Sequence, residues 1–92
     1  MSKSDTHEVH SAARQRDLSV LERLLTKDKG LVHRRDQWDY TPLHFAATAD
    51  VAQLLLKHGA DPNAAGWMGA TPLHRAAEDG RADVLELLIR KT

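Results

Sequence analysis

The chain has 92 residues, and its 13 lysine and arginine residues balance 13 aspartate and glutamate residues, so that its formal net charge is zero. A chain of this length predicts one small domain, and the balanced charge provides no overall field that would attract nucleic acid or an anionic membrane surface. The absence of cysteine excludes disulfides, thiolate chemistry and sulfur-ligated zinc, and it is compatible with a reducing compartment.

Hydrophobic periodicity predicts six helices, two in each of three units, within a single domain of residues 1–92. We expect these helices near residues 7–16, 18–27, 42–48, 50–58, 72–79 and 82–91. Extended, hairpin-like fingers near residues 30–40 and 60–70 join the units, whose approximate bounds are 5–36, 37–66 and 67–92.

The three units are recognised by internal repetition. Residues 41–47 are Thr-Pro-Leu-His-Phe-Ala-Ala and residues 71–77 are Thr-Pro-Leu-His-Arg-Ala-Ala, so that six of seven positions are identical. Residues 9–13, Val-His-Ser-Ala-Ala, repeat the pattern of residues 43–47 in degenerate form. Repetition at this spacing is typical of folds in which similar units stack on one another.

Each full copy of the repeated segment contains the signals that begin a helix. Thr41 and Thr71 are predicted to cap the helix by accepting a backbone N–H. Pro42 and Pro72 follow at the first helical position, where proline loses no hydrogen bond and its φ is already suitable. We therefore expect both helices to start sharply.

The middle unit is shorter than its neighbours. Val51 follows Leu43 by eight residues, whereas Val84 follows Leu73 by eleven. The turn after Thr48 has lost three residues, and we expect the local helices to be tighter or clipped. The shortening is either a notch that receives a partner side chain or drift in a tolerant surface loop.

With these motifs the sequence resembles the ankyrin repeat family over roughly residues 5–92. Residues 58–64, His-Gly-Ala-Asp-Pro-Asn-Ala, are similar to the family's connector, and Gly80 stands where the family has an inter-helix glycine. The resemblance implies an all-α solenoid of three helix–turn–helix units with hairpin-like fingers, in which each unit is stable only against its neighbours. Asp39 replaces the finger glycine that Gly69 retains, so the first finger tip is expected to differ.

The resemblance also implies a partner protein, of unknown identity, bound on the concave side formed by the fingers and the first helix of each unit. The family's variable positions correspond to Gln37, Trp38, Tyr40, Trp67, Met68, Ala70, Arg14, Gln15, Thr48, Ala49, Glu78 and Asp79. Phe45 and Arg75 occupy equivalent positions and could line the same groove, although Phe45 could equally belong to the core. Three of the four aromatic residues lie on the fingers, where they either contact the partner or stack on one another.

Six histidines raise the question of a metal or catalytic site. His10, His44 and His74 occupy equivalent positions in separate units, and helices about 8–10 Å apart keep their rings too distant to share a zinc ion. The resemblance implies that these three are structural hydrogen bonders. His7 and His10 form an i, i+3 pair without an evident third ligand.

The sequence contains no recognisable arrangement of nucleophile, histidine and acid, and no glycine-rich loop that would hold a phosphate. We therefore expect neither an enzyme, nor a metal site, nor a cofactor. The longest apolar strings are far shorter than the roughly 20 residues that span a bilayer. We expect an unexported protein of the cytoplasm or nucleus that binds neither membrane nor nucleic acid.

The two ends of the chain differ in polarity. The first unit carries the charged residues expected of a solvent-facing cap, namely Glu8, Arg14, Arg16, Glu22 and Arg23. Apolar residues 87–89 precede Arg90, Lys91 and Thr92 without a polar closing unit. We expect this edge to be covered by further repeats of a longer adaptor or regulatory protein, or by a second copy. An architectural or self-associating segment is the rival interpretation.

Overall fold

The computed structural model describes the backbone of residues 3–91 and the side chains of residues 8–91. Its α-helices are α1 (Lys3–Gln15), α2 (Leu18–Lys27), α3 (Ala49–Lys57), α4 (Pro72–Glu78) and α5 (Ala82–Lys91). Its 3-10 helices are η1 (Lys29–His33), η2 (Pro42–Phe45) and η3 (Trp67–Gly69). Residues 3–91 contain no β-strand, and the predicted all-α class is confirmed.

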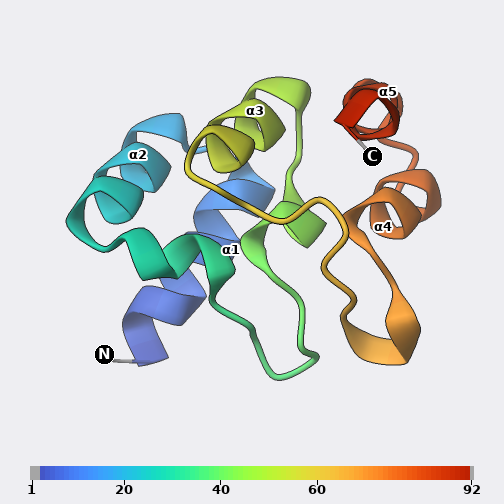
Figure 1. Ribbon diagram of the computed structural model, residues 1–92. Helices are drawn as coiled ribbons and strands as arrows, with labels where there is room; N and C mark the ends of the chain where they lie inside the picture. Colours follow the sequence, from blue (N-terminus) through green and yellow to red (C-terminus); the bar gives the residue numbers. More distant parts are fainter. Residues whose placement is uncertain (1–2, 92) are drawn as a thin grey trace.

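The helices lie in two rows (Figure 1). One row contains α2, α3 and α5, the other contains α1, η2 and α4, and the long connecting loops extend beyond the second row. Along the second row α1 packs on η2 and η2 packs on α4, while α1 pairs with α2 and α4 pairs with α5. This stacking of helical pairs is the predicted solenoid of three units.

The threonine and histidine of the repeated segment act together at the start of each helix. In α4, the imidazole Nδ1 of His74 accepts the backbone N–H of Thr71 at 3.1 Å, and the Thr71 hydroxyl accepts the backbone N–H of His74 at 3.4 Å. His44 makes the same contact to the backbone N–H of Thr41 at 3.0 Å. This reciprocal cap satisfies donors that the first helical turn leaves open.

Two helix boundaries differ from those predicted. The first helix of the middle unit is the short 3-10 helix η2, which ends at Phe45 rather than near residue 48, because the chain has only eight residues in which to pass from Leu43 to Val51. The expected clipping of this unit is therefore confirmed. At the N-terminus, α1 begins at Lys3 rather than near residue 7, because its first turn is polar and leaves no apolar period to detect.

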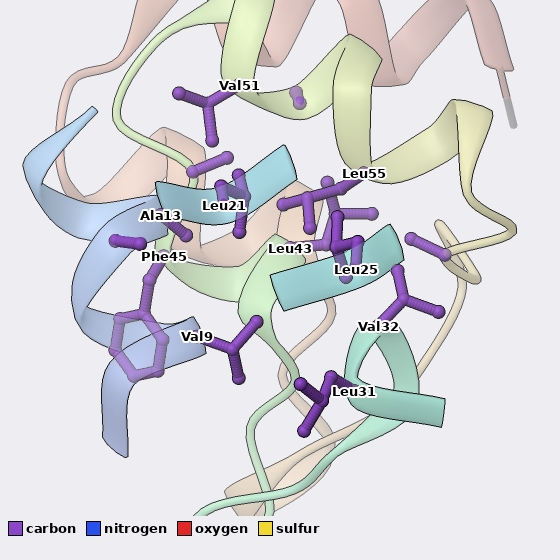
Figure 2. Close-up of a cluster of buried hydrophobic side chains, with 14 of the residues drawn as sticks. Val9, Ala13, Leu21, Leu25, Leu31, Val32, Leu43, Phe45, Val51 and Leu55 are labelled. Atoms are coloured by element: carbon purple, nitrogen blue, oxygen red, sulfur yellow. The ribbon is translucent and has the colours of Figure 1, made fainter. Parts of the chain in front are cut away.

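A single hydrophobic core runs through all three units. Figure 2 shows its part in the first two units, where side chains of α1 and α2 meet those of η1, η2 and α3. The labelled residues are Val9, Ala13, Leu21, Leu25, Leu31, Val32, Leu43, Phe45, Val51 and Leu55. Val84 and Leu88 of α5 continue the same cluster into the third unit. At the open edge Leu73 is only partly buried and Ile89 is 57% exposed.

The two fingers are closed by equivalent backbone hydrogen bonds. The N–H of Asp36 donates to the carbonyl oxygen of Tyr40 at 3.0 Å, and the N–H of Gly66 donates to that of Ala70 at 2.8 Å. Asp39 adopts a φ of 65°, close to the 76° of Gly69. Because aspartate tolerates this left-handed conformation better than most residues, its substitution for the family's glycine does not open the first finger.

The difference in burial between Leu43 and Leu73 predicts unequal losses of stability. Leu43 is fully buried between two neighbouring units, so Leu43→Ala should lower the free energy of unfolding by about 2–5 kcal/mol. Leu73→Ala should cost clearly less, because Leu73 faces the edge that no described residue covers completely. Urea unfolding followed by circular dichroism measures both. Equal losses in the free energy of unfolding would contradict the conclusion that Leu73 lies at an incompletely covered edge.

Candidate functional site

A groove of about 1030 Å³ lies between the two fingers and the inner row of helices, which consists of α1, η2 and α4. Its lining residues come from α1, the two fingers, η2 and α4, and they are His10, Ser11, Arg14, Arg35, Asp36, Gln37, Trp38, Tyr40, Phe45, Trp67 and Arg75. Seven of the residues named from the sequence as possible contacts therefore meet in one place, namely Arg14, Gln37, Trp38, Tyr40, Phe45, Trp67 and Arg75.

The buried lining of the groove is aromatic. Tyr40 is only 8% exposed and Phe45 only 6%, and their rings meet edge to face with centroids 5.8 Å apart. Gly66 makes room for Tyr40, because a Cβ at that position would lie 2.3 Å from its Cδ1. Tyr40 is thus a packed part of the scaffold rather than the exposed finger residue that was expected.

The rim of the groove carries the two tryptophans. Trp38 is 52% exposed and Trp67 is 55% exposed, and their rings meet edge to face with centroids 6.0 Å apart. The backbone N–H of Trp67 donates to the carbonyl oxygen of Trp38 at 3.0 Å, which ties the two finger tips together. The expected contact between finger aromatics is therefore observed for this pair, and about half of each side chain stays exposed, while contact with a partner stays a prediction.

Three arginines line the groove, and two of them are ion-paired. Arg35 donates from Nη1 to the carbonyl oxygens of Asp39 and Ala65, both at 2.8 Å. It also lies 3.6 Å from the Asp39 carboxylate. Arg75 lies over the Tyr40 ring at 5.2 Å and pairs with Glu78 and Asp79 at the end of α4.

The third arginine has no such partner. The guanidinium of Arg14 lies 4.6 Å from the centroid of the Phe45 ring, and no described carboxylate pairs with it. Arg14 is exposed to solvent and belongs to the lining of the groove.

The other predicted contact residues lie outside the groove lining. Met68 is 82% exposed at the tip of the second finger, where it adopts a φ of 58°. Glu78 and Asp79 reach the groove only through their ion pairs with Arg75. Gln15, Thr48, Ala49 and Ala70 are not part of the lining either.

Sequence reasoning missed several lining residues. It did not assign His10, Ser11, Arg35 or Asp36 to the groove. Asp36 lies in the first finger, and its carboxylate Oδ1 accepts the backbone N–H groups of Trp38 and Tyr40, each at 2.9 Å. An Asp followed by a turn is a recognisable signal of such a loop, but it does not indicate which way the loop faces.

The signature histidines connect successive units. Nε2 of His10 lies 2.7 Å from the carbonyl oxygen of Tyr40, and Nε2 of His44 lies 2.8 Å from that of Ala70. The expected structural role is confirmed for these two. His74 caps its own helix in the same way, but its Nε2 has no hydrogen-bond partner among the described residues.

The pKa of His44 is lowered from its ordinary value of 6.5 mainly because the ring is buried. The hydrogen bond to the Ala70 carbonyl opposes this shift, and the charges of Arg35 and Arg75 add to it, while that of Asp36 opposes it. A neutral ring fits the observed contacts, because Nδ1 accepts from Thr41 while Nε2 donates to Ala70.

The described part of the chain has neither a metal-binding cluster nor a membrane-spanning helix. No three of its histidine, cysteine, aspartate or glutamate side chains gather as they would around a metal ion. The side chain of His7, considered above as a partner of His10, lies outside the described residues. None of the helices within residues 3–91 has the length and apolar character needed to cross a membrane.

The sequence of the chain matches a known protein family and several known proteins. Residues 9–92 match the family model for ankyrin repeats in three copies. Inversin of Gallus gallus is 39% identical over 87 residues, which cover 91% of this chain and 8% of inversin. The serine/threonine-protein kinase VIK of Arabidopsis thaliana is 40% identical over 79 residues, which cover 83% of this chain and 18% of the kinase.

Among solved structures, a complex of a predatory endopeptidase from Bdellovibrio bacteriovorus with an immunity protein contains a similar chain. The TM-score is 0.82 and the identity 28%, and the match covers 91% of this chain and 45% of that chain. The present chain therefore spans less than half of that chain and no more than about a fifth of the two curated relatives.

The lowered pKa of His44 predicts that acid destabilises the fold. Unfolded His44 regains its ordinary pKa of 6.5 and binds a proton at a higher pH than folded His44 does. Its contribution to stability is therefore complete above about pH 6.5 and is lost as the pH falls below that value. Melting temperatures between about pH 7.5 and 5 should fall, with a shallower slope for His44→Gln. An NMR titration in which the His44 ring protonates at or above pH 6.5 would contradict this account.

Proposed function

Because this chain belongs to the ankyrin repeat family, whose repeats are protein–protein interaction modules, we propose that it binds a partner protein in the groove between the fingers and the inner helices. The observation that carries the proposal is the pair of half-exposed tryptophans at the rim, held in place by the backbone bond between Trp67 and Trp38. Tryptophan is among the residues that dominate binding energy at protein interfaces. Rings that are already fixed lose little conformational entropy when a partner arrives.

The groove favours binding over catalysis. His10, the histidine in its lining, has Nε2 bonded to the Tyr40 carbonyl oxygen, and Asp36 is bonded to backbone N–H groups of its own finger. Neither is arranged as a base for Ser11. We therefore propose a non-catalytic, cofactor-free module in which Trp38, Trp67, Gln37 and Arg75 contact the partner, with Met68, Glu78 and Asp79 at the border.

Its setting in a longer adaptor or regulatory protein is part of the same proposal. Inversin and the kinase VIK are several times longer than the segments that match this chain, so in each of them the repeats are one part of a larger protein. The similar solved chain comes from a complex of two proteins, as expected if a fold of this kind serves in recognition. Residence in the cytoplasm or nucleus stays a prediction.

A second candidate function is self-association through the C-terminal edge. His10 and His44 each bond a backbone carbonyl of the following unit, whereas the equivalent Nε2 of His74 has no such partner within residues 3–91. Leu73 is partly buried beside it, and Ile89 is 57% exposed on α5. An apolar face with an open donor suits another repeat unit, and a second copy would supply one.

The groove proposal predicts that the tryptophans contribute more to binding than to stability. Trp38→Ala and Trp67→Ala should each weaken partner binding by about 2 kcal/mol, with a small change in melting temperature, because both rings are half exposed. The measurement is affinity capture from extracts of the source cells, followed by titration of the captured protein. Ile89→Ala is the matched control, since it removes exposed apolar surface away from the groove. If the partner is retained by both tryptophan variants, the groove is not the docking site.

The edge proposal makes a separate prediction. Sedimentation equilibrium of the wild-type chain should show a concentration-dependent dimer, and Ile89→Lys should shift it to monomer by placing a charge on the apolar face. Arg90→Gln, a change of the neighbouring exposed residue, is the control and should leave the dimer intact. A wild-type chain that stays monomeric at every concentration would rule out self-association.

A further inference from the structure

We propose that the groove accepts an acidic segment of the partner protein, in which a carboxylate pairs with Arg14 and an adjacent apolar side chain packs against Trp38 and Trp67. This inference rests on the proposed function and adds the chemistry of the partner. It follows from the charges that line the groove, from which of them are already compensated, and from how Arg14 is held.

The lining of the groove contains more positively than negatively charged side chains, although the chain is neutral. Three arginines, Arg14, Arg35 and Arg75, line it against one aspartate, Asp36, while the whole chain has equal numbers of both signs. The excess in the lining is therefore 3 − 1 = 2 positive charges, histidine being left out. Low-dielectric walls strengthen the field of charges in a concave site, and here those walls are aromatic.

Most of these charges are compensated within the chain. Arg35 is paired with Asp39, Arg75 is paired with Glu78 and Asp79, and the Asp36 carboxylate accepts two backbone N–H groups. Among the described residues, only Arg14 contributes a charge to the lining with neither an ion pair nor a hydrogen bond. A partner carboxylate would meet this charge without displacing an existing ion pair.

The position of Arg14 suits a carboxylate in particular. Its guanidinium carbon lies over the Phe45 ring, 4.6 Å from the ring centroid. Within the described residues its N–H donors form no ion pair, and their fork matches the two oxygens of a carboxylate. Phosphate would match the same fork, but it carries more negative charge than a carboxylate, and the lining also contains the carboxylate of Asp36. The charges of the lining therefore favour glutamate or aspartate over a phosphorylated residue.

The chain contains its own reporter of this binding. Trp38 and Trp67 are its only tryptophans, and both lie at the groove, so intrinsic fluorescence reports on the groove alone. The probes are acetylated and amidated hexapeptides in which leucine alternates with glutamate, glutamine, lysine or phosphoserine. We expect the glutamate peptide to change the emission saturably and to bind about tenfold more tightly than the glutamine peptide, with weaker binding of the lysine peptide.

Arg14→Gln is the decisive variant. It should reduce the affinity for the glutamate peptide to that for the glutamine peptide and leave the latter unchanged. Because Arg14 is exposed, its replacement should not unfold the chain, which circular dichroism checks. Arg23→Gln on α2 is the matched control, an exposed arginine away from the groove, and it should behave as wild type. Raising the salt concentration should weaken binding of the glutamate peptide and leave binding of the uncharged glutamine peptide nearly unchanged.

Several results would overturn the inference. Equal affinities for the glutamate and glutamine peptides, an Arg14→Gln variant that binds the glutamate peptide as wild type does, or a phosphoserine peptide that binds most tightly would each contradict it. So would the absence of any response to the glutamate peptide. The proposed function is tested separately, because a captured partner that is lost with Trp38→Ala but kept with Arg14→Gln would preserve the groove as a docking site and reject the acidic segment.

Discussion

The structure depends on one constraint, which is that no unit of this chain can bury its apolar residues alone. Leu43 and Leu55 of the middle unit are buried in one cluster with Val9 and Leu21 of the first. The signature histidines reinforce this dependence, since the ring of His10 bonds a backbone carbonyl 30 residues further along the chain. Removing contacts at one interface therefore weakens both units that share it, as expected for a stack of repeats.

The same contacts that hold the units together also build the groove. The carbonyl oxygen that His10 bonds belongs to Tyr40, so the bond between two units anchors the end of a finger. Tyr40 then fills the space left by Gly66 and lies beneath Arg75. The tryptophan rim is fixed to this scaffold by backbone hydrogen bonding rather than by its own side chains. A binding surface of this kind is rigid because it is an extension of the core.

The three arginines of the groove differ in whether their charge is compensated by other groups of the chain. Arg35 and Arg75 are bound by carboxylates and carbonyl oxygens of the chain itself, and they shape the surface more than they attract a partner. Arg14 is held by an aromatic ring, which fixes a cation without neutralising it. Complementary charge at an interface contributes mainly to specificity and to the rate of association, while the buried aromatic contacts contribute affinity.

The sequence by itself determined the repeat, the three units and the way their helices begin, because capping by Thr71 and His74 involves residues only three positions apart. It also determined that the middle unit is clipped, since Val51 follows Leu43 by only eight positions, which leaves no room for a longer helix. Only the tertiary structure decided that Tyr40 is buried, that Arg35 and Asp36 line the groove, and that the tryptophans meet. Those outcomes depend on contacts between residues about 30 positions apart, such as Tyr40 with Gly66 and Trp38 with Trp67, which no local pattern encodes.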